Sequence, residues 1–231
     1  MGAGLGTAVG PGARVTALVP MKARSVRVPN KNVRDVGGRP LFYHVLDTLR
    51  EATTISDIAV NTDSEQIKAL LREQFPEVII IDRPEELAGS DVPMNAVIAY
   101  DLEHLPGDVF LQTHSTNPLL KATTVDSAVE AFLGQDEHDS LFSVHAVRKR
   151  FYDAHGRAVN HDPAVLLNTQ DLPPLFEENS CIYLFTRDSF AATGARLGHT
   201  ALMYEIDPRE AVDIDDELDM DIVRALLERE R

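Results

Sequence analysis

The stretch that decides the fold is residues 15–32, which read VTALVPMKARSVRVPNKN. Its beginning, residues 15–20, is a short apolar run typical of a buried strand. The remainder is a polar loop rich in lysine and arginine, and it leaves the carboxyl end of that strand. Open α/β sheets bind their ligands in the crevice at the carboxyl ends of the strands. The stretch therefore predicts the first strand of an α/β sheet and a candidate binding loop.

Strand-like and helical patterns alternate along the rest of the chain. Short apolar runs predict strands at residues 57–62, 77–81, 108–113, 140–145, 181–185 and 201–206. Apolar periodicity predicts helices at residues 41–51, 94–104, 123–132 and 216–230, and one more that starts after Asp63 as its N-cap. The apolar face of the last helix is expected to consist of Leu218, Ile222, Val223, Leu226 and Leu227. This alternation predicts an α/β fold with a three-layer, mainly parallel, Rossmann-like sheet.

The alternation is interrupted between residues 147 and 180, where polar turns and only short apolar pieces occur. A plain loop of this length is uncommon, so we expect an inserted extension, residues 147–180, of irregular structure and short strands. Residues 1–13 are rich in glycine and alanine and lack the features of a signal peptide, which predicts a disordered N-terminus. We therefore expect one domain, residues 14–231, that carries the extension.

Composition limits the partners that the protein can have. The net charge of −15 argues against nucleic acid, because binding to a phosphate backbone needs a basic surface. The one cysteine, Cys181, excludes an intrachain disulfide, and its apolar neighbours indicate a buried strand residue rather than a nucleophile. No apolar run approaches the roughly 20 residues that a membrane span needs. A cytoplasmic protein without a membrane partner is the expectation.

Two segments carry chemistry by composition. Six cations gather in and after the first loop, and they could surround a triphosphate and stabilise a leaving pyrophosphate: Lys22, Arg24, Arg27, Lys31, Arg34 and Arg39. A solvated basic loop explains them equally well, and the spacing of a P-loop is absent. Asp213 and Asp215 would project from one face of an extended segment, as Mg²⁺ ligands do. The residues alone favour a different interpretation, in which Asp215, Asp216 and Glu217 form the acidic start of the last helix.

The order of residues goes further than composition. Pro20, a basic loop that ends in Pro29-x-Lys31-Asn32, and then Gly38-x-Pro40-Leu41 resemble the first signature of the acylneuraminate (CMP-sialic acid synthetase-like) cytidylyltransferases. Five later segments are similar to that family's motifs in the same order: NTDSEQI at 61–67, RPEELA at 83–88, LQTHSTNPL at 111–119, NSCIY at 179–183 and DIDDELD at 213–219.

This resemblance implies a CTP-dependent enzyme that transfers CMP to a small acidic acceptor, most simply a 2-keto-3-deoxy sugar acid, and that works as a homodimer joined through the extension. It implies catalytic roles for Lys22, Arg27 and Lys31, and Mg²⁺ held by Asp213 and Asp215. The nucleotide-binding residues implied are Lys22, Ala23, Arg24, Ser25, Lys31, Asn32, Arg83, Asn95 and Gln112. The acceptor-binding residues implied are Gln112, Lys149, Arg150, Gln170 and Asn179.

The chain also departs from the family's pattern. Ala23-Arg24 replaces Gly-Gly, and Thr169 stands where the sialic-acid enzymes have an arginine expected to hold the acceptor's carboxylate. Either Lys149 or Arg150 takes the place of that arginine, or the acceptor is a different acid, with a small phosphonate as the alternative. A UTP- or dTTP-dependent sugar-1-phosphate nucleotidyltransferase would need a G-x-G-T-R loop, which is absent. A catalytically silent nucleotide-binding protein is the third alternative.

Overall fold

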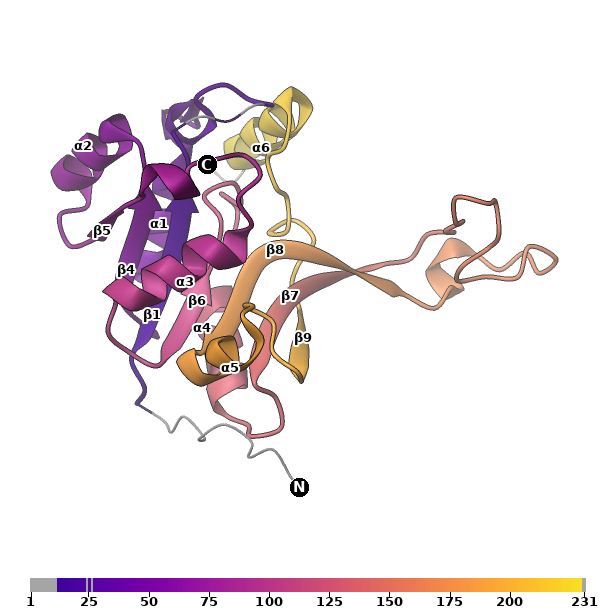
Figure 1. Ribbon diagram of the computed structural model, residues 1–231. Helices are drawn as coiled ribbons and strands as arrows, with labels where there is room; N and C mark the ends of the chain where they lie inside the picture. Colours follow the sequence, from indigo (N-terminus) through magenta and orange to yellow (C-terminus); the bar gives the residue numbers. More distant parts are fainter. Residues whose placement is uncertain (1–11, 24, 26, 230–231) are drawn as a thin grey trace.

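A computed structural model of the protein describes residues 12–23, 25 and 27–229. The described chain forms a seven-stranded sheet with helices on both faces, and a long arm projects from one side (Figure 1). The strands are β1 (Val15–Met21), β2 (Asp35–Val36), β3 (Arg39–Pro40), β4 (Ile55–Thr62), β5 (Ile79–Asp82), β6 (Val109–Gln112), β7 (Ser140–Val147), β8 (Leu175–Thr186) and β9 (Ala201–Glu205). The α-helices are α1 (Leu41–Glu51), α2 (Glu65–Gln74), α3 (Met94–His104), α4 (Ala122–Leu133), α5 (Arg187–Thr193) and α6 (Glu217–Arg229).

The sheet has the order β5-β4-β1-β6-β8-β7-β9. The pairs of β1 with β4 and β6, of β4 with β5 and of β7 with β9 are parallel, whereas β8 runs antiparallel to β6 and β7. The mainly parallel α/β sheet is thereby confirmed. The parallel strands β1, β4 and β6 end at the same edge, so the loops that follow them meet there (Figure 1).

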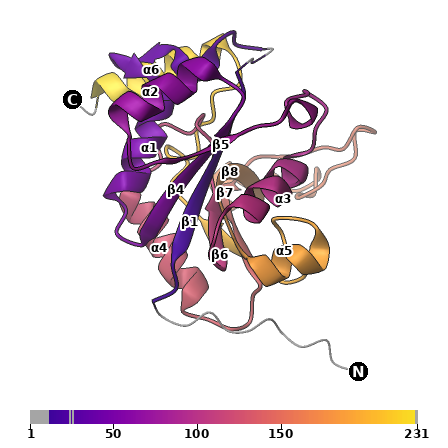
Figure 2. The same ribbon diagram turned by 60° about the vertical axis from the view of Figure 1, so that its left-hand side comes forward.

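Two apolar cores make the three layers. Helices α1, α2 and α4 cover one face of the sheet, and α3 and α5 cover the other (Figure 2). Strand β1 shows why, because successive side chains of a strand point to opposite faces. Ala17 and Val19 belong to the first core, whereas Leu18, which lies between them, belongs to the second. Each large apolar side chain buried in this way contributes about 1.5–3 kcal/mol.

The arm is built on the two longest neighbouring strands. Beyond the sheet, residues 145–147 of β7 continue as a ribbon with residues 175–177 of β8, and residues 148–174 connect them at the far end (Figure 1). The extension expected at residues 147–180 corresponds to this arm together with the first residues of β8, which begins at Leu175. A two-stranded ribbon outside the domain covers no core on either face. Its sequence therefore lacks the apolar run by which the buried part of the strand was recognised.

A third, smaller core lies beside the sheet. It joins the short β2/β3 hairpin, which the sequence did not predict, to the 213–215 segment and α6; its buried members are Val28, Val36, Leu41, Ile214, Met220 and Val223. The predicted apolar face of the last helix was partly wrong. Met220 and Val223 are buried, whereas Leu218 is 68% exposed. The helix is thus rotated relative to the prediction, because its contact partner is the small third core.

The start of α2 also differs from the prediction. Ser64, not Asp63, is the N-cap, and its hydroxyl accepts a hydrogen bond from the Ile67 amide at 3.3 Å. Asp63 instead accepts a hydrogen bond from the Ala23 amide at 2.7 Å, so its carboxylate serves the first loop. Ala13 packs against the first core, while residues 1–11 lie outside the described part, where the predicted disorder stays a prediction. Within the described residues, no helix has the length and apolar character needed to cross a membrane.

Candidate functional site

The first loop is fixed to the acidic segment at the carboxyl edge of the sheet. The Lys31 ammonium donates a hydrogen bond to the carbonyl oxygen of Ile214 at 2.5 Å and lies 4.0 Å from Asp215 Oδ1. Arg27 forms an ion pair with the same carboxylate at 2.7 Å. Ile214 is buried in the third core, which leaves Asp213 and Asp215 on the other side of the extended segment. Two cations and two carboxylates are thereby brought together.

The helix-start interpretation of the acidic segment holds for Asp216, and Asp219 shares this role. Asp219 accepts hydrogen bonds from the amides of Asp215 and Asp216 at 2.8 and 3.0 Å, and Asp216 accepts from the amides of Leu218 and Asp219 at 2.8 and 3.1 Å. These two carboxylates therefore satisfy the free amides at the start of α6. The carboxylates of Asp213 and Asp215 are left for another role.

Asp213 fits a cation ligand. Among the residues that the structure describes, no hydrogen-bond partner reaches its buried Oδ1 atom. Burial raises the pKa of Asp213 and the charge of Asp215 adds to this, while Thr116 and Lys31 oppose it. A buried carboxylate oxygen without a donor is costly, and Mg²⁺ typically binds one or two carboxylates together with substrate phosphates. The donor set therefore suits Mg²⁺.

Lys31 has an electrostatic environment of its own. Burial lowers its pKa and the charge of Arg27 adds to this, while Asp213 and Asp215 raise it. The ammonium is thus partly desolvated and lies beside the carboxylates that suit a cation. A cation in such a place interacts more strongly with an anionic ligand than it would in water.

Asn32 holds the start of the loop. Its amide donates to the carbonyl oxygen of Lys22 at 3.1 Å, and its Oδ1 accepts from the Ser115 hydroxyl at 2.7 Å. The Lys22 ammonium donates to the carbonyl oxygen of Gly89 at 2.6 Å, which ties the loop to the segment before α3. Ser25 is half-buried, and Arg24 lies outside the described residues. The roles of these residues in nucleotide binding stay predictions.

Arg83 lies in a buried polar network after β5. Its Nε donates to Asn61 Oδ1 at 2.5 Å and its Nη2 to the Asn61 carbonyl oxygen at 3.1 Å, while Asn61 donates to Asp101. Burial raises the pKa of Asp101 to about 6 against the lowering by Asn61 and Arg83. Within the described chain, Arg83 Nη1 is buried and has no hydrogen-bond partner. That atom is a donor which a ligand could satisfy.

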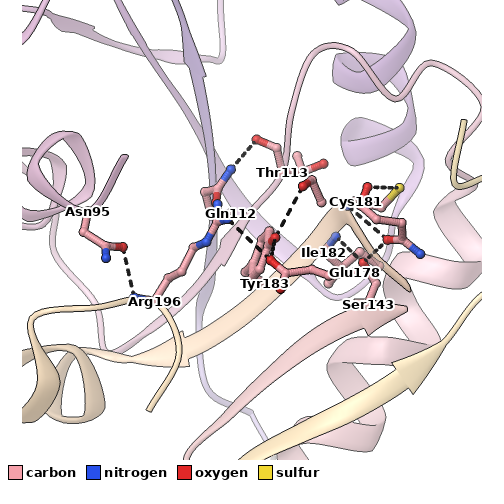
Figure 3. Close-up of polar contacts among 11 residues, drawn as sticks. Asn95, Gln112, Thr113, Ser143, Glu178, Cys181, Ile182, Tyr183 and Arg196 are labelled. Carbon is pink, nitrogen blue, oxygen red and sulfur yellow. Dashed lines mark hydrogen bonds and ion pairs between the residues drawn. The ribbon is translucent and has the colours of Figure 1, made fainter. Parts of the chain in front are cut away.

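Gln112 lies at the end of β6 and contacts an arginine that the sequence analysis missed. Gln112 Oε1 accepts a hydrogen bond from Arg196, and its Nε2 donates to the Thr113 carbonyl oxygen at 2.9 Å (Figure 3). Arg196 also stacks on the Tyr183 ring, 3.4 Å from the centroid. Its backbone amide donates to Asn95 Oδ1 at 3.3 Å. The predicted residues Gln112 and Asn95 thus meet around Arg196, which lies in a loop with no motif that indicates a site.

The remaining acceptor candidates are divided between two places. Asn179 is buried in β8, where its Oδ1 accepts from the Ser143 hydroxyl at 2.6 Å; in the described structure no acceptor reaches its Nδ2. Lys149, Arg150 and Gln170 lie exposed on the arm, which extends away from β6 and the Gln112 at its end (Figure 1). One chain therefore does not assemble all the predicted acceptor residues.

The candidate nucleophiles Cys181, Ser115 and Thr116, and the candidate base His114, have structural roles in the described chain. Cys181 is fully buried in β8, as predicted, and burial raises the pKa of its thiol. Ser115 donates to Asn32, and the Thr116 carbonyl oxygen accepts from the Ile214 amide at 3.0 Å. His114 has a pKa lowered to about 4 by burial, then by the charges of Arg196 and Lys31, so it is neutral near pH 7. His114, Ser115 and Thr116 are thus part of a loop of the site and do not form a triad.

Comparisons with known proteins identify the family of the chain. A family model described as cytidylyltransferase matches residues 16–229. CMP-N,N'-diacetyllegionaminic acid synthase of Legionella pneumophila is 29% identical over 93% of this chain and 97% of its own length. N-acylneuraminate cytidylyltransferase A of Danio rerio is 26% identical over 89% of this chain and 49% of its own length. For 3-deoxy-manno-octulosonate cytidylyltransferase of Chlorobaculum tepidum the identity is 32% over 51% of this chain and 45% of its own length, so the chain spans about half the length of some curated relatives that it matches.

Solved structures share the fold. The structure of CMP:2-keto-3-deoxy-manno-octonic acid synthetase complexed with CTP has a TM-score of 0.71 at 14% identity and covers 95% of this chain and 100% of its own. A 4-diphosphocytidyl-2C-methyl-D-erythritol synthase from Anaerococcus prevotii has a TM-score of 0.68 at 14% identity, over 94% of this chain and 97% of its own. The Rossmann-like nucleotidyltransferase sheet is thus confirmed. With the family model matching nearly the whole described sheet, the chain belongs to the cytidylyltransferase family.

Proposed function

We propose that the protein transfers CMP from CTP to a small acidic acceptor and releases pyrophosphate. An acceptor oxygen would attack the α-phosphorus of CTP, and the bond from this phosphorus to the leaving pyrophosphate would break. The observation that carries the proposal is the contact of Lys31 with the 213–215 segment, which places two cations and two carboxylates at the carboxyl edge of the sheet. The family and the fold support it.

In this proposal the chain acts by positioning and by electrostatic stabilisation. Lys31 and Arg27 would hold the phosphates of CTP and stabilise the charge on the leaving pyrophosphate. Mg²⁺ bound by Asp213 and Asp215 would supply further charge neutralisation at the phosphates. Asn32 fixes the first loop to the loop after β6 through its contact with Ser115. Arg83, with its unpartnered Nη1 in the described chain, would donate to the nucleotide.

A sugar acid is the acceptor that the relatives favour. The relatives described above are named for legionaminic, neuraminic and 3-deoxy-manno-octulosonic acids. All three are acids with a carboxylate, which agrees with the cationic Arg196 beside Gln112. A phosphonate is the second acceptor class to be tested, because Thr169 stands where the arginine is expected.

We also propose that the arm joins two copies of the chain. Leu166 is 91% exposed, and Val159, Val165, Leu167 and Phe176 are exposed as well. An apolar surface of this kind on a projecting arm is typical of a protein interface. In a dimer, Lys149, Arg150 and Gln170 would cap the acceptor site of the partner, which would explain why one chain keeps them apart from Gln112.

Pyrophosphate release tests the function. The purified protein is incubated with Mg²⁺, one of CTP, UTP, dTTP or ATP, and one of N-acetylneuraminate, 3-deoxy-manno-octulosonate, 2-hydroxyethylphosphonate or a sugar 1-phosphate. We expect release with CTP and a sugar acid. Release with UTP or dTTP and a sugar 1-phosphate would replace the proposal by the other nucleotidyltransferase class. CTP binding without release from any acid would indicate a silent nucleotide-binding protein.

A further inference from the structure

We infer that Arg196 binds the acid group of the acceptor, in place of the arginine that is absent at position 169. The inference rests on the proposed function and assigns its acceptor recognition to a residue of the same chain. Thr169 lies exposed on the arm, whereas Arg196 belongs to the loop after α5 and contacts Gln112 at the end of β6. The acid group would therefore be held at the sheet rather than by the arm.

The position of the Arg196 side chain is well defined. Its guanidinium lies over the Tyr183 ring at 3.4 Å from the centroid and donates to Gln112 Oε1 (Figure 3). The Arg196 amide is held by Asn95 at the start of α3, so both ends of the residue are anchored. Two different elements thus fix the direction of this cation before any ligand binds, which lowers the entropic cost of binding.

The charge of Arg196 is poorly compensated within the described chain. Its side chain is 20% exposed, and its nearest carboxylate, Glu178, lies 3.8 Å away and is itself 46% exposed. Glu178 also accepts a hydrogen bond from the Tyr183 hydroxyl, so its charge is shared between two donors. A desolvated guanidinium normally has a close, bidentate anion. An acid group of the acceptor would supply that partner.

The surroundings of Arg196 separate it from the phosphate site. Lys31 and Arg27 lie on the side of β1 and the 213–215 segment, while Arg196 lies on Tyr183 of β8, on the other side of β6. His114 lies within electrostatic reach of both Lys31 and Arg196. An acceptor with its acid group on Arg196 would thus extend toward the nucleotide phosphates past His114.

The ligand chemistry follows from the donors. A planar guanidinium binds a carboxylate or a phosphonate through two parallel hydrogen bonds, and a lysine cannot do so. Gln112 is positioned beside the same group and could donate its amide if it turned from the Thr113 carbonyl oxygen. The site would therefore select an acid over the corresponding neutral ester or alcohol.

The test measures steady-state kinetics of Arg196→Gln with the best acceptor of the panel above and with the methyl ester of that acceptor. We expect the KM for the acid to rise about 30-fold while the KM for CTP changes little. The KM for the ester should be the same in Arg196→Gln and in the wild type, because the ester has no charge for Arg196 to bind. Arg196→Lys should fall between the wild type and Arg196→Gln. Arg14→Gln makes the same change at an exposed ion pair at the opposite edge of the sheet and should leave both KM values unchanged.

The outcomes distinguish the inference from the function. If the wild type releases no pyrophosphate from CTP with any acid, the proposed function fails. If the wild type is active and Arg196→Gln keeps the wild-type KM for the acid, the inference is wrong. It is also wrong if the substitution raises the KM for the ester as much as the KM for the acid. A melting temperature for each variant identifies loss of the fold. If Arg196→Gln is unfolded, the KM of Arg196→Lys for the acid decides the question, because that variant keeps the charge and the stacking.

Discussion

The Lys31 ammonium donates a hydrogen bond of 2.5 Å to the carbonyl oxygen of Ile214, although 183 positions separate the two residues in the chain. One residue belongs to the first loop and the other to the segment before the last helix. The buried Ile214 side chain fixes that segment in the third core, so the contact sets where Lys31 lies relative to Asp213 and Asp215. Catalysis by positioning depends on such a relationship.

Replacing this lysine should remove activity without removing the fold. We expect Lys31→Met to lower kcat/KM for CTP by about 100-fold or more, because a preorganised cation at the phosphates is lost. Arg34→Gln is the control, since Arg34 pairs with Glu217 at a more exposed site in the same region. It should stay within about 3-fold of the wild type. Equal losses in both variants would contradict the role of Lys31.

Asp213 and Asp215 should respond differently to a metal titration from Asp216 and Asp219, the carboxylates at the start of α6. Asp213→Asn should raise the Mg²⁺ concentration needed for half-maximal activity, because a charged ligand becomes a neutral one. Asp216→Asn removes the same charge but keeps an oxygen that can cap α6. Its Mg²⁺ requirement should be that of the wild type. A shift of similar size in Asp216→Asn would indicate a general effect of charge and not a metal site.

The buried Asp101 should make stability depend on pH. Folding raises its pKa from 3.8 to about 6, so the protonated form is favoured in the folded state. The resulting stabilisation is complete below 3.8 and is lost as the pH rises through about 6. Asp101→Asn should therefore gain stability relative to the wild type over this range, by up to about 3 kcal/mol. Urea unfolding at pH 4, 5, 6 and 7 measures the difference; a constant difference would contradict the assignment.

Ser180 holds a backbone conformation that favours glycine. Its φ is 58°, in the left-handed region that residues with a Cβ rarely adopt. Ser180→Gly should stabilise the protein by about 1 kcal/mol in urea unfolding. Gly194 has a φ of 68° with nothing within 4 Å of an added Cβ, so Gly194→Ala should be destabilising by a similar amount. Two changes of the same sign would mean that side-chain contacts outweigh the backbone.

The arm should control the oligomeric state. Leu166→Asp places a charge on the most exposed apolar side chain of the arm, and we expect it to shift the protein from dimer to monomer in sedimentation equilibrium. Leu218→Asp makes the same substitution on the 68% exposed side chain of α6 and should leave the dimer intact. A wild-type protein that sediments as a monomer would overturn the proposed dimer.

The sequence by itself determined the alternating strands and helices, because buried strands and amphipathic helices leave periodic apolar patterns. It also indicated the basic loop and the Asp213–Asp215 pair through the order of their motifs. The bounds of α1 and α3 were predicted without error. The arm was less predictable, since an exposed ribbon has no core to impose a pattern on it.

Tertiary structure alone decided which of these residues meet. Asp216 and Asp219 look the same as Asp213 and Asp215 in the sequence, but only the hydrogen bonds of α6 show which pair caps the helix. Arg196 has no motif around it, and its contact with Gln112 joins residues 84 positions apart. The register of the sheet brings these loops to one edge, and a local pattern does not encode distances across a sheet. The loop of residues 15–32 was therefore visible from the start, whereas its partners were fixed by the fold.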